Sequence, residues 1–382
     1  MTSVVWPFVP GFPLTEILEW RSDLLRAKSA EQRIATRAQP RQLFRIESLY
    51  DQQQFSRAQS MAKALTADTL MLPNWADLIE YGAISAAVDT LTFDTTTSDY
   101  TDGGQLIVWQ SDTVFEVATI DMLEDASITL SAGLGASYTK AYVMPLLSVR
   151  FVQPLTVSRA VVPYAEGQCQ FVATTTTDLG DASAYATYRS HPVMTDTRML
   201  AGDLSERFVR ESESIDNGTG LIGQIADFDY PIHTSQMSWH IQSRAELWAL
   251  RQWLHYCRGR QRGFWLPSYN KDLQVTADIT SGGSTITVQS VGYPDFETVR
   301  DIMIEDTSGN RYYRRINSGV AGGGNTEVLT LSAAAGINLT VAQVRRISYL
   351  TYMRNNADRI EIQHYAPGKA TVSVPVMEAP AP

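Results

Sequence analysis

The chain has 382 residues, enough for two or three ordinary domains and a large buried core. Its 44% hydrophobic and 10% aromatic content is that of a globular protein, not a disordered one. The formal net charge of −10 argues against a groove that grips nucleic acid phosphates. It does not exclude a surface past which DNA slides, because like charges do not bind each other.

Cysteine usage and hydropathy exclude three further classes of protein. Cys169 and Cys257 are the two cysteines, and they form no paired motif, so we expect neither a disulfide framework nor a cysteine-based zinc site. No apolar run approaches the roughly 18 residues of a membrane helix, so we expect no membrane insertion by this chain. The N-terminal residues lack the pattern of a secretory signal, which predicts folding in a cytoplasm.

Residues 1–39 are predicted to be an N-terminal arm with a docking helix. Prolines among aromatic residues suggest an extended start that packs against another surface. Thr15 can cap a helix whose apolar positions would then be buried on one face. These positions are Ile17, Trp20, Leu24 and Leu25.

Residues 40–175 are predicted to be a first β unit with one helix. The spacing of Phe55, Ala58, Ala62 and Leu65 predicts a half-buried helix, which is followed by a corner at Leu72-Pro73. Short strands with turn-rich connections suggest a small barrel inserted at about residues 74–140. The predicted strands are 43–46, 90–93, 106–109, 114–118, 128–130, 142–152, 155–159 and 169–174.

The second half of the sequence follows the same order. Residues 176–233 are predicted to be a linker arm with a short helix at 203–208 and a tight turn at 216–220. Residues 234–378 would form a second unit with a barrel at about 268–345, and residues 379–382 a tail. The predicted strands are 237–241, 264–266, 285–288, 302–304, 312–316, 328–331, 341–350, 359–363 and 370–376, with a helix face marked by Leu247, Leu250 and Leu254.

Matching blocks indicate that the two units are copies of each other. Leu72-Pro73 and Leu266-Pro267 each follow a helix, and the segment from Thr90 parallels that from Thr285. The extra residues 320–325 fit an insertion at a hairpin tip. The fold class that follows is mainly β: two repeated units, each a β-sandwich with one helix and an inserted small β-barrel.

The sequence offers no catalytic or metal-binding pattern. None of the five histidines has metal-ligand spacing, and the glycine clusters are typical of hairpin turns. The acidic run Glu206, Glu211, Glu213 and Asp216 beside Arg207 and Arg210 is typical of a solvated helix face. We therefore expect no enzyme, no cofactor and no metal.

The basic turn from Arg258 to Arg262 could bind single-stranded nucleic acid by stacking on Phe264 and Trp265. Core packing of these two aromatic residues is the favoured alternative, because they lie in a strand beside an apolar helix. The arginines would then pair with acidic partners across an interface.

Several blocks carry a family resemblance. They are Glu19–Ala27 with Glu31–Arg33, Asp216–Gly220, Arg258–Gln261, Phe264–Pro267, and Asp272-Leu273. The chain resembles tail-tip proteins of long non-contractile-tailed bacteriophages and prophages, and more broadly the distal tail proteins. The helix, Gly-Arg turn and aromatic strand are similar to a stretch in distal tail proteins of gene transfer particles. Two copies of the unit set this chain apart from the simplest distal tail proteins.

The resemblance implies a structural virion protein at the tail tip or baseplate, assembled in the host cytoplasm. It would form a ring that joins the tail tube protein to baseplate hub and tip proteins, with DNA passing through without specific binding. Residues 6–25 and 204–208 would clasp a neighbouring subunit. Three two-unit chains would supply six equivalent sheets, and a hexamer is the alternative.

Two other functions stay open at this stage: a carbohydrate- or receptor-binding tail module with exposed aromatics such as Trp75 or Tyr269, and a cell-wall hydrolase. The residues expected at structural contacts and interfaces are Trp20, Arg26, Arg33, Pro73, Trp75, Arg258, Arg260, Phe264, Trp265 and Pro267.

Overall fold

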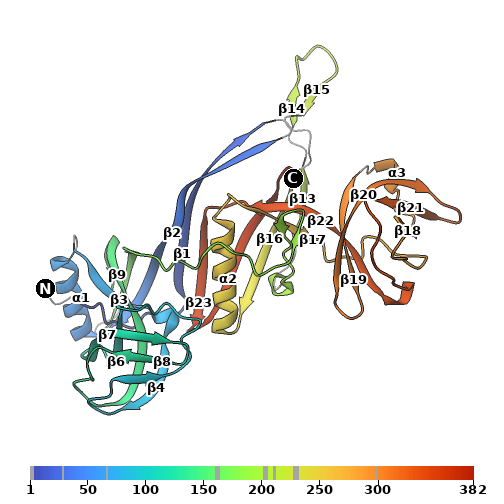
Figure 1. Cartoon of the computed structure of the whole chain (residues 1–382). Coiled ribbons are helices and arrows are strands. Elements are labelled where there is room, and N and C mark those ends of the chain that lie inside the picture. The colour runs from blue at the N-terminus through green and yellow to red at the C-terminus, as the bar shows by residue number, and fades with distance from the viewer. Residues whose placement is uncertain are drawn as a thin grey trace.

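The computed structural model describes residues 4–27, 30–65, 68–159, 164–200, 205–209, 212–226, 232–296 and 299–382. The chain is mainly β, as the sequence predicts, and its large sheet is antiparallel (Figure 1). Two smaller β regions lie at opposite ends of this sheet, and helix α2 lies across its middle.

The first half contains one helix, and its strands include most of those predicted. Its elements are β1 (Leu14–Arg26), β2 (Glu31–Tyr50), α1 (Gln52–Ala64), β3 (Leu70–Pro73), a 3-10 turn (Trp75–Asp77), β4 (Ile79–Ile84), β5 (Thr90–Thr92), β6 (Gln105–Ser111), β7 (Val114–Glu124), β8 (Ser127–Leu130), β9 (Tyr138–Ser158) and β10 (Ala165–Ala173).

The rest of the chain begins with short strands, which are followed by β16, α2 and the strands of the second half. Its elements are β11 (Thr187–Tyr188), β12 (His191–Pro192), a 3-10 turn (Thr197–Met199), β13 (Arg207–Val209), β14 (Ser212–Ile215), β15 (Gly223–Ala226), β16 (Ile232–Ile241), α2 (Arg244–Cys257), β17 (Gly263–Pro267), β18 (Thr285–Gln289), α3 (Tyr293–Phe296), β19 (Arg300–Asp306), β20 (Arg311–Ala321), β21 (Thr326–Leu331), a 3-10 turn (Val341–Gln343), β22 (Val344–Asn355), β23 (Arg359–Ala366) and β24 (Lys369–Glu378).

The helix predicted to begin at Thr15 is wrong, because this segment is strand β1. The spacing of Ile17, Trp20 and Leu24 suits a helix, but β1 pairs with β2 on one edge and with β23 on the other. The tertiary pairing therefore outweighs the local pattern. Together β1 and β2 form a long hairpin that projects beyond the sheet (Figure 1). The arm that was expected to clasp a neighbour thus lies, in its first part, inside its own chain.

The extended start of the chain packs on the first half. The peptide N–H of Trp6 donates to the Met71 carbonyl at 2.8 Å, and Val5 forms a parallel bridge with Met71. The side chains of Trp6 and Phe8 are almost completely buried. The aromatic residues of this segment are therefore core residues of the same chain.

The helices begin where their capping residues stand. Asp51 accepts hydrogen bonds from the N–H groups of Gln53 and Gln54, and the Gln54 side chain completes a capping box for α1. Ser243 caps α2 by accepting from the N–H of Glu246. The helices predicted from Phe55 to Leu65 and around Leu247 to Leu254 are therefore confirmed.

Side chains facing α1 and α2 form an apolar row across the main sheet. The row follows the paired residues from β9 through β10, β2, β1, β23 and β24 to β16. Glu16 is the one charged residue in it. Its residues are Phe151, Phe171, Phe44, Glu16, Ile362, Val372 and Trp239. Because the row crosses β1, the cores of the two halves share one sheet.

The neighbouring row, which points to the opposite face, is polar. Its residues, in the same strand order, are Gln153, Gln170, Arg45, Thr15, Gln363, Thr371 and His240. Side chains alternate between the faces of a strand, so this polar row lies on the face of the sheet away from the helices.

Seven strand pairings have the same order in both halves, with β22 and β23 in the place of β9, whereas β4–β9 and β22–β24 occur in one half each. In the first half they are β2–β10, β9–β10, β3–β9, β5–β8, β6–β7, β6–β9 and β7–β8. In the second half they are β16–β24, β23–β24, β17–β22, β18–β21, β19–β20, β19–β22 and β20–β21.

The strands inserted after each proline corner have hydrophobic clusters of their own. One cluster includes Leu91, Leu106 and Ile128, and the other includes Ile286, Ile302 and Leu329. The extra residues 320–325 lie at the β20–β21 hairpin tip, as predicted. Each inserted region is therefore packed around its own core at one end of the main sheet.

The linker between the halves contains a second hairpin in place of the predicted short helix. Residues 201–204 lie outside the described residues, and Arg207–Val209 form β13, which pairs with β16. Strands β14 and β15 pair and project from the sheet (Figure 1), with the predicted turn at 216–220 at their tip. The helix prediction is therefore wrong for residues 207 and 208.

Replacing Phe171 with Ala tests the shared core. The ring is fully buried and lies 4.7 Å from the Phe151 ring, centroid to centroid. We expect Phe171→Ala to lower the free energy of unfolding by roughly 3–5 kcal/mol, because it leaves a cavity. Urea unfolding followed by tryptophan fluorescence measures the change. The matched control is Phe296→Ala at a ring that is 84% exposed, where we expect a change within about 0.5 kcal/mol.

Candidate functional site

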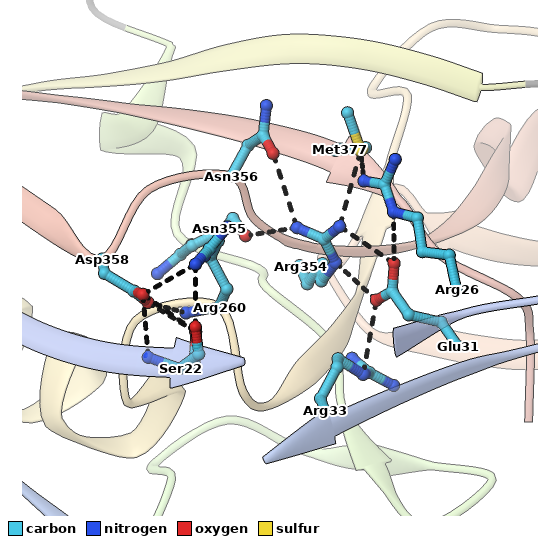
Figure 2. Close-up of polar contacts among 10 residues, drawn as sticks. All are labelled: Ser22, Arg26, Glu31, Arg33, Arg260, Arg354, Asn355, Asn356, Asp358 and Met377. Atoms are coloured by element: carbon cyan, nitrogen blue, oxygen red, sulfur yellow. Dashed lines mark hydrogen bonds and ion pairs between the residues drawn. The ribbon is translucent and has the colours of Figure 1, made fainter. Parts of the chain in front are cut away.

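Four of the predicted contact residues meet near the hairpin of β1 and β2. Trp20 and Arg26 lie on β1, Arg33 lies on β2, and Arg260 comes from the turn after α2. Figure 2 shows the polar contacts of the three arginines, which converge on two acidic residues, Glu31 and Asp358. The structure therefore joins residues that the sequence separates by more than 200 positions.

Glu31 is held by a completely buried arginine. Arg354 on β22 donates from Nε to Glu31 Oε1 at 2.6 Å and from Nη2 to Oε2 at 3.0 Å. Arg26 and Arg33 approach the same carboxylate at 3.2 and 3.6 Å (Figure 2). Burial alone would raise the pKa of Glu31, but the hydrogen bonds and charges of these arginines outweigh it and lower that pKa.

Asp358 holds the other strand of the hairpin. Its carboxylate accepts from the Ser22 N–H at 2.9 Å, the Ser22 hydroxyl at 2.7 Å and Arg260 Nη2 at 3.0 Å (Figure 2). Although burial raises the pKa of Asp358, these donors lower it overall. Both strands of the hairpin are therefore fastened to the second half by charged groups that stay ionised at neutral pH.

A third cluster of charges lies deeper, between α2 and the first half. Glu16 on β1 lies 3.4 Å from Arg251 on α2 and 3.0 Å from His364 Nε2 on β23. Arg251 also donates to Asp99 at 2.9 Å, and Asp99 accepts from Asn74 at 3.0 Å. The side chains of Glu16, Arg251 and Asp99 are all at least 94% buried. This network joins the two halves through their polar groups.

The pKa of Glu16 reflects these partners. Burial acts to raise it, but the charge of Arg251 and the hydrogen bonds from His364 and Gln42 lower it to about 2. A carboxylate held ionised in this way is a partner in a buried ion pair. It is not poised as a general acid near neutral pH.

The remaining predicted contact residues lie elsewhere. Pro73 ends β3 opposite Leu146, and Trp75 packs edge-on against Trp109 with ring centroids 5.4 Å apart. Phe264, Trp265 and Pro267 are buried in β17, which confirms the expected core packing. All five residues are buried, and the structure does not bring them to the charged clusters.

The basic turn pairs with acids of its own chain. Arg258 and Arg262 each donate to Asp181, at 3.1 and 2.7 Å. Arg258 also ends α2 in the left-handed conformation, with φ of 51°. The acidic partners expected across an interface are therefore found within the chain.

Trp75 and Tyr269, the aromatic residues considered for sugar binding, are 3% and 9% exposed. A sugar-binding platform needs an accessible ring face, so these two residues do not provide one.

Sequence analysis missed the residues at the centre of each charged cluster. Arg354 and Asp358 carry no local signal, because their partners come from distant parts of the chain. Arg251 does have one: it lies on the same helix face as the buried residues Leu247 and Leu254. An arginine at such a position predicts a buried partner.

The geometry offers no metal site or membrane span in the part of the chain that the structure describes. Across these residues, His, Cys, Asp and Glu side chains do not gather in groups of three suited to a metal ion. None of the described helices is long and apolar enough to cross a membrane. No protein-family model matches the chain, and comparison with curated proteins finds no matching sequence.

Replacing Glu31 with Gln tests the first charged cluster. The substitution leaves buried Arg354 without its counter-charge, so we expect the free energy of unfolding to fall by roughly 3–5 kcal/mol. Urea unfolding of both proteins measures this. The matched control is Glu361→Gln, at a side chain that is 38% exposed, where the loss should stay below about 1 kcal/mol. Equal effects of the two substitutions would contradict the buried-pair account.

The pKa of Glu16 predicts an acid-dependent part of the stability. Because the folded-state pKa of about 2 lies below the ordinary value of 4.5, Glu16 contributes fully above pH 4.5. That contribution is lost as the pH falls from 4.5 towards 2. The difference in unfolding free energy between the wild type and Glu16→Gln should therefore shrink over this range. A difference that is constant with pH would rule out the assignment to Glu16.

Proposed function

We propose that this chain is a structural virion protein that forms a ring at the distal end of a phage tail. The observation that carries the proposal is the single sheet shared by both halves. One of its faces is covered by α1 and α2, and the other presents the polar row that runs from Gln153 on β9 to His240 on β16. A polar row that spans both halves suits the wall of a channel that DNA crosses.

The charges on this face of the sheet suit the passage of DNA better than the binding of DNA. Arg45 lies 3.8 Å from Glu361, which also pairs with Arg359 at 3.1 Å. The other residues of the polar row are Gln, Thr and His, so this face carries paired charges of both signs rather than the uniformly acidic charge that the net charge suggests. Positive charge that is already paired offers little to DNA phosphates.

We propose further that the chain arose by duplication of one unit, in which a sandwich-like sheet with a helix carries an inserted small barrel. The recurrence of strand pairings supports this, as do the two helix caps at Asp51 and Ser243. Two units per chain would let three copies supply six equivalent units, so a trimer could meet both the six-fold end of a tail tube and a three-fold tip.

The proposal includes neither catalysis nor a cofactor. Its support is that three carboxylates with a lowered pKa, those of Glu16, Glu31 and Asp358, are each engaged by arginine and serve to hold strands. Partners would be other copies of the chain, the tail tube protein and hub or tip proteins of the baseplate. The place of action would be the virion, after assembly in the host cytoplasm.

The assembly state of the purified protein tests the proposal. We expect class averages from electron microscopy to show a closed ring with a central hole, and light scattering to give the mass of three chains. A mass of six chains would support a ring of six chains instead of a ring of three. A protein that remains monomeric at high concentration, both alone and with tail tube protein, would overturn the proposal.

A further inference from the structure

A groove of about 400 Å³ lies between α1 and the last part of β9. Phe55, Gln59 and Ala62 line it from α1, and Leu155, Val157 and Arg159 line it from the β9 side. Beyond Val149, β9 pairs only with β10 among the described residues. The groove therefore runs along an unpaired strand edge.

The corresponding place in the second half is filled by β1. Counted from the caps Asp51 and Ser243, Gln59 corresponds to Arg251, and Lys63 corresponds to His255. Arg251 contacts Glu16, and the ring of His255 packs edge-on against that of Trp20 at 5.7 Å. The α1 side of the groove thus consists of the counterparts of α2 residues that hold β1.

The strand side of the groove matches in the same way. Tyr50 and Ile241, at the ends of β2 and β16, pair with Ala165 and Ala370. Two residues further along, Gly167 on β10 pairs with Val157 on β9. In the same way, Val372 on β24 pairs with Ile362 on β23. Val157 therefore corresponds to Ile362, Leu155 to Ile360, and Arg159 to His364. In the second half, Ile360, Ile362 and His364 are the residues opposite β1.

The counterpart of β1 is β13. Gln42 precedes Tyr50 by the same number of residues as His233 precedes Ile241. Gln42 pairs with Leu18, and His233 pairs with Phe208. Phe208 therefore corresponds to Leu18, and Glu206 to Glu16. Leu18 is fully buried, whereas Phe208 is 68% exposed. Among the described residues, β13 pairs with β16 alone, so its other edge is open.

We propose that β13 of one copy of this chain inserts into the groove between α1 and β9 of a second copy. Phe208 would lie opposite Leu155 and pack on Phe55, and Glu206 would lie opposite Val157. The contact between two chains would repeat the contact that β1 makes with β23 and α2 inside one chain. The proposal rests on the proposed ring function and names the surfaces through which its subunits join.

Charge complementarity favours this occupant. Arg159 and Lys63 give the groove a positive end, with the Arg159 guanidinium 4.4 Å from the centre of the Phe55 ring. Glu206, which lies 3.4 Å from His233, would meet this end of the groove as Glu16 meets Arg251 and His364. An apolar ring flanked by a carboxylate thus matches an apolar groove flanked by cations.

Cysteine cross-linking tests the register. Directly opposed residues on paired strands have Cβ atoms about 4.5–5.5 Å apart, close to disulfide range. We expect a mixture of Glu206→Cys and Val157→Cys proteins to give a disulfide-linked pair of chains on oxidation. The native Cys169 and Cys257 are buried. The matched control mixes Glu206→Cys with Val320→Cys, at an exposed residue of a distant hairpin, and should give no linked pair above background.

Two substitutions test the side chains. Phe208→Asp should weaken association at least about tenfold in analytical ultracentrifugation, while Phe296→Asp, at a similarly exposed ring, should leave it unchanged. Glu206→Arg should also weaken association, and adding Arg159→Glu to the same chain should restore it. Circular dichroism confirms that each variant is folded.

The outcomes separate this proposal from the ring. Rings that form without the cross-link and without sensitivity to Phe208→Asp would overturn the strand insertion and leave the ring function standing. Cross-linked open chains that never close would support the insertion and overturn the ring. A protein that forms neither cross-links nor oligomers would overturn both.

Discussion

The structure depends on strand β1 being hydrogen-bonded along both edges. In its first part, Thr15–Glu19 pair with β2 of the first half and with β23 of the second half at the same time. The second half therefore completes its sheet through a strand of the first half. Without β1, the edges of β2 and β23 would face each other unpaired, and unpaired edges favour unwanted association.

Burying Glu16 within this junction has a cost that its partners offset. An isolated carboxylate at such a site would be strongly destabilising, but Arg251, His364 and Gln42 supply charge and donors on several sides. Since these partners come from α2, β23 and β2, the network is complete only when both halves are correctly docked. Buried polar groups of this kind are poor sources of net stability and good sources of specificity in alignment.

Local patterns were sufficient for elements whose burial follows one period. Helix α2 was predictable because Leu247, Leu250 and Leu254 recur on one face, and the strand at 285–288 because its buried residues alternate. They failed for β1, where Leu14 to Leu18 are all buried, on both faces of the sheet, so neither period stands out. The charged clusters were beyond local reasoning altogether. Glu31 and Arg354 meet only because the long hairpin crosses to the second half.

The two arms of the chain are unequal in a way that bears on assembly. The hairpin of β1 and β2 is secured on both sides by Glu31, Asp358 and Glu16, whereas β13 pairs with β16 alone among the described residues. One of the two matching contacts is made within the chain. For the other contact, the chain carries an open strand edge on β13 and a separate groove between α1 and β9. Joining them between chains gives a head-to-tail interface, and such interfaces produce either a closed ring or an endless filament. The internal contact fixes the rotation from one unit to the next, so the same rotation, repeated between chains, determines whether the ring closes.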